Sequence, residues 1–69
     1  MKQGKFEVLN NNGEILLKTG FVNNRFGVYK NENKRWDLSD LTSRLLILTN
    51  VSLREVRDTI QVFKNLYAK

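Results

Sequence analysis

The sequence contains no cysteine, no histidine and no proline. It therefore lacks the usual ligands of structural zinc, a thiol nucleophile, and an imidazole that could act as acid, base or metal ligand. No apolar run reaches the ~18 residues of a membrane span, and no signal-type apolar segment follows the first residues. These absences predict a protein of the cytoplasm without a metal site or membrane contact.

Sequence motifs of enzymes are also missing: there is no phosphate-binding loop, no nucleophile elbow and no pairing of a nucleophile with a base. The nearest approach to a carboxylate pair is Asp37 with Asp40, and a spacing of three places the two on opposite faces of a strand. The chain is thus predicted to be a non-enzyme with no catalytic residue, no cofactor and no small-molecule substrate.

The chain has 69 residues, of which 41% are hydrophobic and 28% charged, as in an ordinary folded domain. This length predicts one small domain over 1–69, with a single core and no room for a large cleft.

The last third of the chain predicts one amphipathic helix over about 52–67. Ser52 is a candidate N-cap, and Glu55 three residues later completes a capping box. An apolar stripe then recurs at steps of three and four, through Leu53, Val56, Ile60, Phe63 and Tyr67. This stripe needs an apolar surface to cover it.

Asparagine and glycine mark the first two turns of a predicted sheet over about 5–49. Asn12-Gly13 is a strong signal for a two-residue hairpin loop, which sets Val8 opposite Leu17, and Asn23-Asn24 is the next turn candidate. In this register we expect the helix-facing side of these strands to carry Phe6, Val8, Ile15, Leu17, Phe21, Phe26 and Val28.

Two further strands complete the prediction. For Trp36 and Leu38 to join the same face, the loop before them must have three or five residues, which predicts a bulge. Residues 44–49 form the last strand, whose consecutive aliphatic side chains leave its facing open. The predicted fold is α+β, an antiparallel five-stranded meander with one C-terminal helix packed on one face.

The net charge is +5, and residues 1–36 carry seven Lys or Arg against three Glu. Such a basic half favours nucleic acid, DNA or RNA, as a partner. We expect contact through the outer sheet face and the loop before Trp36, an aromatic residue whose burial the sequence leaves open. Arg54 and Arg57 are expected on the solvent side of the helix. The candidate binding residues are Lys5, Lys18, Arg25, Tyr29, Lys30, Lys34 and Arg35.

The outer sheet face also carries many aliphatic residues, which predicts the alternative function of a protein-interaction module, either a homodimer or a modulator of a host protein. The alternative explanation is a strand shifted by one residue, or an N-terminal tail that folds back. Gly20 opposite Gly27 favours a bend in the sheet over a ligand contact. The candidate interface residues are Leu9, Leu16, Leu46 and Leu48.

The segment Trp36-Asp37-Leu38-Ser39-Asp40-Leu41-Thr42-Ser43-Arg44-Leu45-Leu46-Ile47, with Ser52 opening a helix, resembles small uncharacterised open reading frames of bacteriophages and integrated elements of low-GC Gram-positive bacteria. The sequence departs from their pattern at Arg44, where they tend to have glycine. The resemblance implies a phage accessory protein that acts by binding in the host cytoplasm.

Overall fold

The computed structural model describes residues 2–67, with the side chain of Tyr67 excepted, and has five antiparallel strands followed by one helix. The strands are β1 (Lys2–Leu9), β2 (Ile15–Asn23), β3 (Phe26–Lys30), β4 (Trp36–Asp40) and β5 (Leu46–Val51), and the helix is α1 (Leu53–Tyr67). They form one open sheet in the order β1-β2-β3-β4-β5. The predicted α+β meander with a C-terminal helix is confirmed.

Helix α1 starts where the capping signal places it. The backbone N–H of Glu55 donates to the Ser52 hydroxyl at 3.2 Å, and this hydroxyl donates to the Glu55 carboxylate at 3.4 Å. Val56 and Ile60 are buried, and the half-buried Phe63 packs against them. The predicted cap and stripe are thus confirmed up to Phe63, while the Tyr67 side chain lies outside the described residues.

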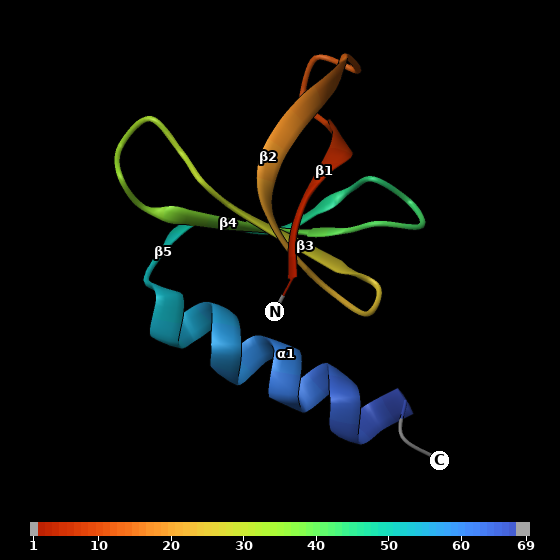
Figure 1. Ribbon diagram of the computed structural model, residues 1–69, viewed down its shortest axis with the longest axis vertical. Coiled ribbons are helices and arrows are strands. Elements are labelled where there is room, and N and C mark those ends of the chain that lie inside the picture. The colour runs from red at the N-terminus through yellow and green to blue at the C-terminus, as the bar shows by residue number, and fades with distance from the viewer. Residues whose placement is uncertain (1, 68–69) are drawn as a thin grey trace.

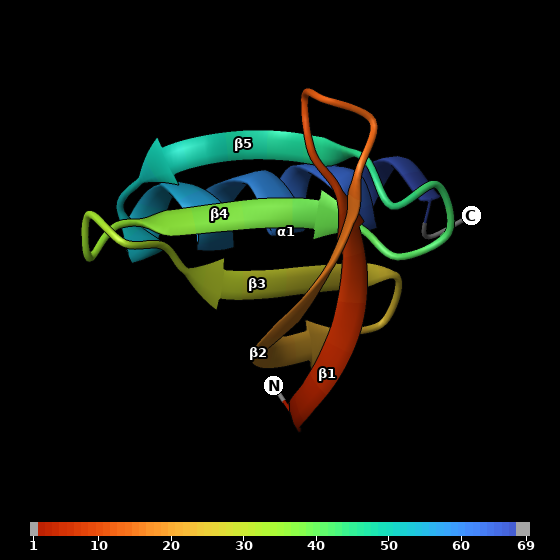
Figure 2. The same cartoon turned by 90° about the horizontal axis from the view of Figure 1, so that it is seen from above.

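The sheet is covered on both faces (Figure 1). Helix α1 lies along one face of β3, β4 and β5, and the hairpin β1–β2 rises from the other face and crosses over the sheet at a steep angle (Figure 2). The backbone N–H of Leu9 ties this hairpin to the β4–β5 loop by donating to the Arg44 carbonyl at 2.7 Å. The N-terminal segment therefore folds back over the face that was expected to be open.

Two apolar clusters result, one on each face. The helix-side cluster consists of Phe26, Val28, Leu38, Val56 and Ile60, with Trp36, Ile47, Leu48, Val51 and Phe63 packed against it. The hairpin-side cluster consists of Phe6, Val8 and Tyr29, with Val22, Leu41 and Leu46 packed against it. The single core expected from the sequence is thus wrong for Phe6 and Val8.

The first hairpin explains this error. Its loop has three residues between Asn10 and Glu14, whose backbones pair at 2.9 Å, and Gly13 takes the left-handed φ of 79°. Val8 therefore pairs with Leu16 rather than with Leu17. Because a shift of one residue exchanges the faces of a strand, Phe6 and Val8 turn to the hairpin side with Val22. Ile15 and Leu17 stay on the Phe21 face of β2 and are 50% and 67% exposed.

The loop between β3 and β4 follows the same plan and confirms its prediction. Asn31 pairs with Arg35 around three residues, and Lys34 occupies the left-handed position at φ 60°. Trp36 and Leu38 consequently share the helix-side face with Phe26 and Val28. The odd loop length inferred from the apolar pattern is correct, while the pairing of β3 with β4 runs without a register shift.

Strand β5 has no uniform facing, because its pairing with β4 shifts on either side of Leu38. Leu46 packs on the hairpin side, whereas Ile47 and Leu48 both pack on the helix side. Leu45, just before the strand, is 53% exposed.

Glycine allows the closest contacts between the layers. A Cβ atom at Gly20 would collide with the Val28 carbonyl oxygen, so β2 approaches the β3 backbone there. Gly20 pairs with Gly4 and not, as expected, with Gly27. At Gly27 a Cβ would meet the Phe6 ring at 2.6 Å.

We therefore expect Gly27→Ala to lower the free energy of unfolding by about 1–3 kcal/mol, because the added methyl group overpacks the hairpin-side cluster. Gly4→Ala is the matched control, since its Cβ would meet only the Val22 side chain at 3.3 Å. Urea denaturation of both variants measures the difference. An equal loss at Gly4 and Gly27 would contradict the packing of Phe6 on β3.

Candidate nucleic-acid interface

The seven basic and aromatic residues expected to bind nucleic acid do not form one surface. Lys5 and Lys18 lie on the β1–β2 hairpin, and Arg25 lies at the β2–β3 turn. Lys30, Lys34 and Arg35 lie in or beside the β3–β4 loop, at the opposite end of the sheet (Figure 1). The five residues of β3 lie between the β2–β3 turn with Arg25 and the β3–β4 loop. At ~3.3 Å per residue, they separate the turn from the loop by roughly 17 Å.

Tyr29 was expected on an open outer face, but it is only 5% exposed. Its ring packs against the Phe6 ring at 6.1 Å between centroids, and the ammonium group of Lys18 lies 5.1 Å from its centre. Burial, followed by a hydrogen bond to Asp37 and the charge of that carboxylate, raises the pKa of the Tyr29 hydroxyl. Tyr29 is therefore part of the interior and cannot stack on a base.

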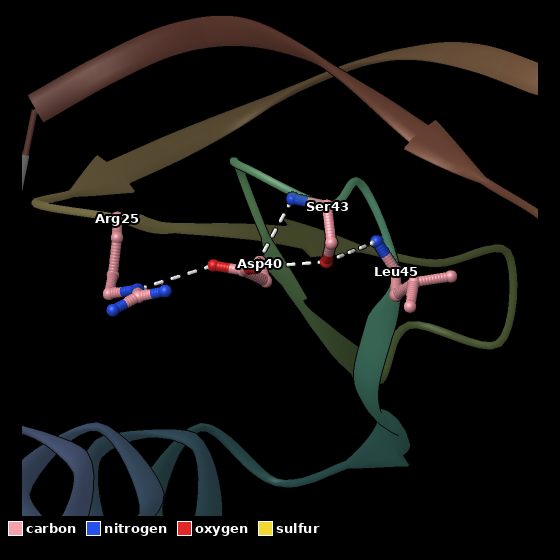
Figure 3. Close-up of polar contacts among 4 residues, drawn as sticks. All are labelled: Arg25, Asp40, Ser43 and Leu45. Carbon is pink, nitrogen blue, oxygen red and sulfur yellow. Dashed lines mark hydrogen bonds and ion pairs between the residues drawn. The ribbon is translucent and has the colours of Figure 1, made fainter.

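Arg25 contacts Asp40 at the far end of the sheet (Figure 3). The distance from Arg25 Nε to Asp40 Oδ1 is 3.4 Å, and the second oxygen of Asp40 accepts hydrogen bonds from the Ser43 hydroxyl and backbone N–H. Burial acts to raise the pKa of Asp40, but the hydrogen bonds from Ser43 and then Arg25 outweigh it and lower that pKa. Arg25 thus joins the β2–β3 turn to β4.

A hollow of about 300 Å³ adjoins this ion pair. A carboxylate in its wall opposes the binding of phosphate, so we do not assign nucleic acid to it. Its lining consists of Arg25, Phe26, Asp40, Ser43, Leu45, Leu46, Ile47 and Phe63.

The β3–β4 loop presents three exposed cations, Lys30, Lys34 and Arg35, against one anion, Glu32. The Asn31 side-chain oxygen accepts hydrogen bonds from the backbone N–H groups of Asn33 and Arg35 at 2.9 and 3.1 Å. These bonds close the loop from within and hold its cations on a defined backbone.

The same asparagine anchors the loop to the sheet. Its amide group donates to Asp37 at 3.0 Å, and this carboxylate also accepts from the backbone N–H of Asn50 at 2.8 Å. Asp37 is only 7% exposed, so its charge is directed into this network and away from the surface. The asparagine–aspartate network therefore fixes the basic loop to the segment that leads into α1.

Beside the loop lies a hollow of about 410 Å³ lined by Phe21, Trp36, Leu53 and Arg57, which we call the aromatic hollow. The rings of Phe21 and Trp36 lie 6.3 Å apart and are tilted by 41°. The ammonium group of Lys30 lies 5.9 Å from the centre of the Trp36 ring. Trp36, whose burial the sequence left open, is half-buried and both packs on the core and lines this hollow.

Sequence reasoning did not assign Phe21, Leu53 or Arg57 to a site. The alternation pattern does place Phe21 and Trp36 on one sheet face, but Arg57 was expected across the core from any binding surface. Leu53 and Arg57 are four residues apart, so their side chains are neighbours on the surface of the helix. This spacing is the signal that could have indicated the hollow.

The four leucines of the alternative interface are also dispersed. Leu46 packs on the hairpin-side cluster, Leu48 packs on the helix-side cluster, and Leu9 is half-buried. Leu16 is 37% exposed on the hairpin. The expected apolar outer face does not exist, because the hairpin covers it.

Comparisons with protein-family models, curated proteins and solved structures gave no significant match. In the part of the chain that the structure describes, no three Asp or Glu side chains gather as metal ligands would. Over the same residues, no helix has the length and apolar character needed to cross a membrane. The resemblance to phage reading frames stays a prediction.

The low pKa of Asp40 makes its contribution to stability depend on pH. Aspartate in an unfolded chain has a pKa of ~3.9. Above that pH the ionised Asp40 stabilises the fold fully, and this stabilisation is lost as the pH falls through the lower pKa of Asp40 in the folded state. We expect Asp40→Asn to lower the free energy of unfolding at about pH 7, and this loss to shrink below about pH 4. Urea denaturation across this range tests the effect, and a loss that is constant with pH would contradict it.

Proposed function

We propose that the protein is a small non-enzymatic nucleic-acid-binding protein whose contact surface is the β3–β4 loop together with the aromatic hollow. The observation that carries this proposal is the gathering of Lys30, Lys34 and Arg35 on a loop fixed by hydrogen bonds, next to a hollow lined by Arg57. Cationic side chains bind the phosphate groups of nucleic acid whatever its base sequence, and the net charge of +5 favours such binding.

The conformation of Lys34 supports this use of the loop. The equivalent position of the first hairpin is Gly13, and both residues have left-handed φ values, 79° for Gly13 and 60° for Lys34. A side chain in this conformation costs roughly 1–2 kcal/mol. Because Arg44 also has a left-handed φ of 67°, this conformation supports a binding role for Lys34 only together with its position between Lys30 and Arg35 in the sequence.

The resemblance to phage reading frames supports an accessory role in a host cell. The proposed location is the host cytoplasm, with DNA or RNA as the partner. About four phosphate contacts to a single strand would make the logarithm of the affinity fall with the logarithm of the salt concentration at a slope of roughly −3.

Replacing Lys34 and Arg44 separately by glycine gives a matched test. Both residues have positive φ, 60° and 67°, and each change removes one positive charge, but Arg44 lies in the β4–β5 loop at the other end of the sheet. The ion pair of Arg44 with Glu7 at 3.3 Å is half exposed and contributes little to stability. We expect both variants to keep or gain stability by up to about 1 kcal/mol, and only Lys34→Gly to weaken binding.

Fluorescence anisotropy with labelled oligonucleotides at low salt measures the affinity. The proposal predicts a loss of several-fold for Lys34→Gly and little change for Arg44→Gly. An equal loss in both variants would indicate general attraction to a basic protein, and no binding by the unaltered chain would exclude the function.

The exposed side chains of Ile15 and Leu17 support a second candidate function, a protein-interaction module. The two residues are neighbours on the outer face of β2 and are 50% and 67% exposed. We expect self-association at high concentration, and its loss in Ile15→Lys/Leu17→Lys, because charge on this face opposes the burial of the patch. Light scattering of both chains tests this, and a monomer at every concentration would contradict the homodimer.

A further inference from the structure

The aromatic hollow has walls of three chemical kinds. Phe21 and Trp36 supply aromatic rings, Leu53 supplies an aliphatic surface, and Arg57 supplies a guanidinium group. Its volume of about 410 Å³ lies in the lower part of the ~300–1,000 Å³ range of ligand pockets. A flat aromatic group with an attached anion matches these walls, and a nucleotide is such a group.

The two rings are too close to receive another ring between them. Their separation of 6.3 Å is a direct aromatic contact. A bound ring must therefore stack on the open side of the pair. Because Trp36 is half-buried on the core, its orientation is fixed before any ligand arrives.

Lys30 marks the open face of Trp36. Its side chain is exposed, and its ammonium group lies 5.9 Å from the centre of the Trp36 ring. An exposed contact between an ammonium group and an aromatic ring raises the equilibrium constant for its formation about 2- to 5-fold. A base stacked on an aromatic side chain raises the binding constant about 5- to 150-fold. A base can therefore displace the ammonium group, which is then free to pair with the adjoining phosphate.

We propose that the aromatic hollow binds one unpaired base, so that the protein binds single-stranded nucleic acid in preference to a duplex. In a duplex the faces of each base are covered by its stacked neighbours, and an isolated aromatic ring on a protein reaches them only after unstacking. This inference rests on the proposed function, since Lys30, Lys34 and Arg35 hold the phosphates on either side of the base.

Intrinsic fluorescence tests the inference on the unaltered chain, because Trp36 is the only tryptophan. The probes are oligothymidylate and oligouridylate of about twelve nucleotides, within the range of ~4–16 that a small domain covers. An abasic oligomer of the same length and charge and a duplex of the same length are the comparisons.

We expect the single strands to quench the fluorescence of Trp36 and to bind about 5- to 150-fold more tightly than the abasic oligomer. Preference between the two single strands distinguishes DNA from RNA, and quenching by either supports the inference. Equal affinity for the abasic oligomer, or tighter binding of the duplex, overturns it while leaving the proposed function intact. Binding of none of the four probes overturns both.

Arg57→Gln and Arg54→Gln form a matched pair for the position of the site. Both residues are exposed on α1, but of the two only Arg57 lines the hollow. We expect Arg57→Gln to weaken the single-strand complex several-fold and Arg54→Gln to leave it nearly unchanged, with both variants folded by circular dichroism. Equal losses would contradict a site in the hollow.

Trp36→Leu, which keeps an apolar side chain on the core, should reduce the affinity for the single strands to that for the abasic oligomer. Retained preference for the single strands in a folded variant overturns the inference. Should Trp36→Leu fail to fold, the abasic comparison on the unaltered chain and the arginine pair still support or overturn it.

Discussion

The burial of β3 and β4 on both faces is the constraint on which the rest of the structure depends. Phe26, Val28 and Leu38 turn to the helix, while Gly27 and Tyr29 turn to the hairpin. A chain of 69 residues has one helix and one hairpin with which to cover these faces, and it uses both. Two clusters of modest size follow in place of one larger core. The surfaces left exposed include the ends of the sheet, the outside of the hairpin and the solvent side of α1.

The sequence predicts the elements well and the first register poorly. The helix is defined by Ser52 and its apolar stripe, and the β3–β4 loop is defined by the requirement that Trp36 and Leu38 join an existing face. No such requirement acts on the first loop, because Asn10 to Asn12 permit either a two-residue or a three-residue turn. The side chain of Asn10 decides the matter by accepting hydrogen bonds from the backbone N–H groups of Asn12 and Glu14, both at 2.9 Å. Asn31 repeats these contacts in the β3–β4 loop.

This one-residue difference also determines how much of the candidate site could be predicted. Lys30, Lys34 and Arg35 form a group because they are close in the sequence, and no register can separate them. Lys18 and Tyr29 were placed on an open face by the pairing of β2 with its neighbours, and the observed pairing buries that face. The sequence pattern indicates the two halves of the aromatic hollow, Phe21 with Trp36 and Leu53 with Arg57, but it does not predict that β2, β4 and the first turns of α1 meet there. Its assembly depends on where the helix crosses the sheet, which the local sequence does not encode.

The two ends of the sheet differ in how they use charge. At one end Asp40 accepts from Arg25 and Ser43, so a carboxylate and a guanidinium group are both used in joining loops. At the other end the carboxylate of Asp37 is turned inward onto Asn31 and Asn50, and the cations of the loop remain on the surface. A buried anion that fixes a basic loop without neutralising it keeps the positive field directed at the solvent. The fold therefore separates the two roles of charge, and the cations stay exposed at the end where the half-buried ring of Trp36 packs on the core. This is the end to which we assign binding in our proposal.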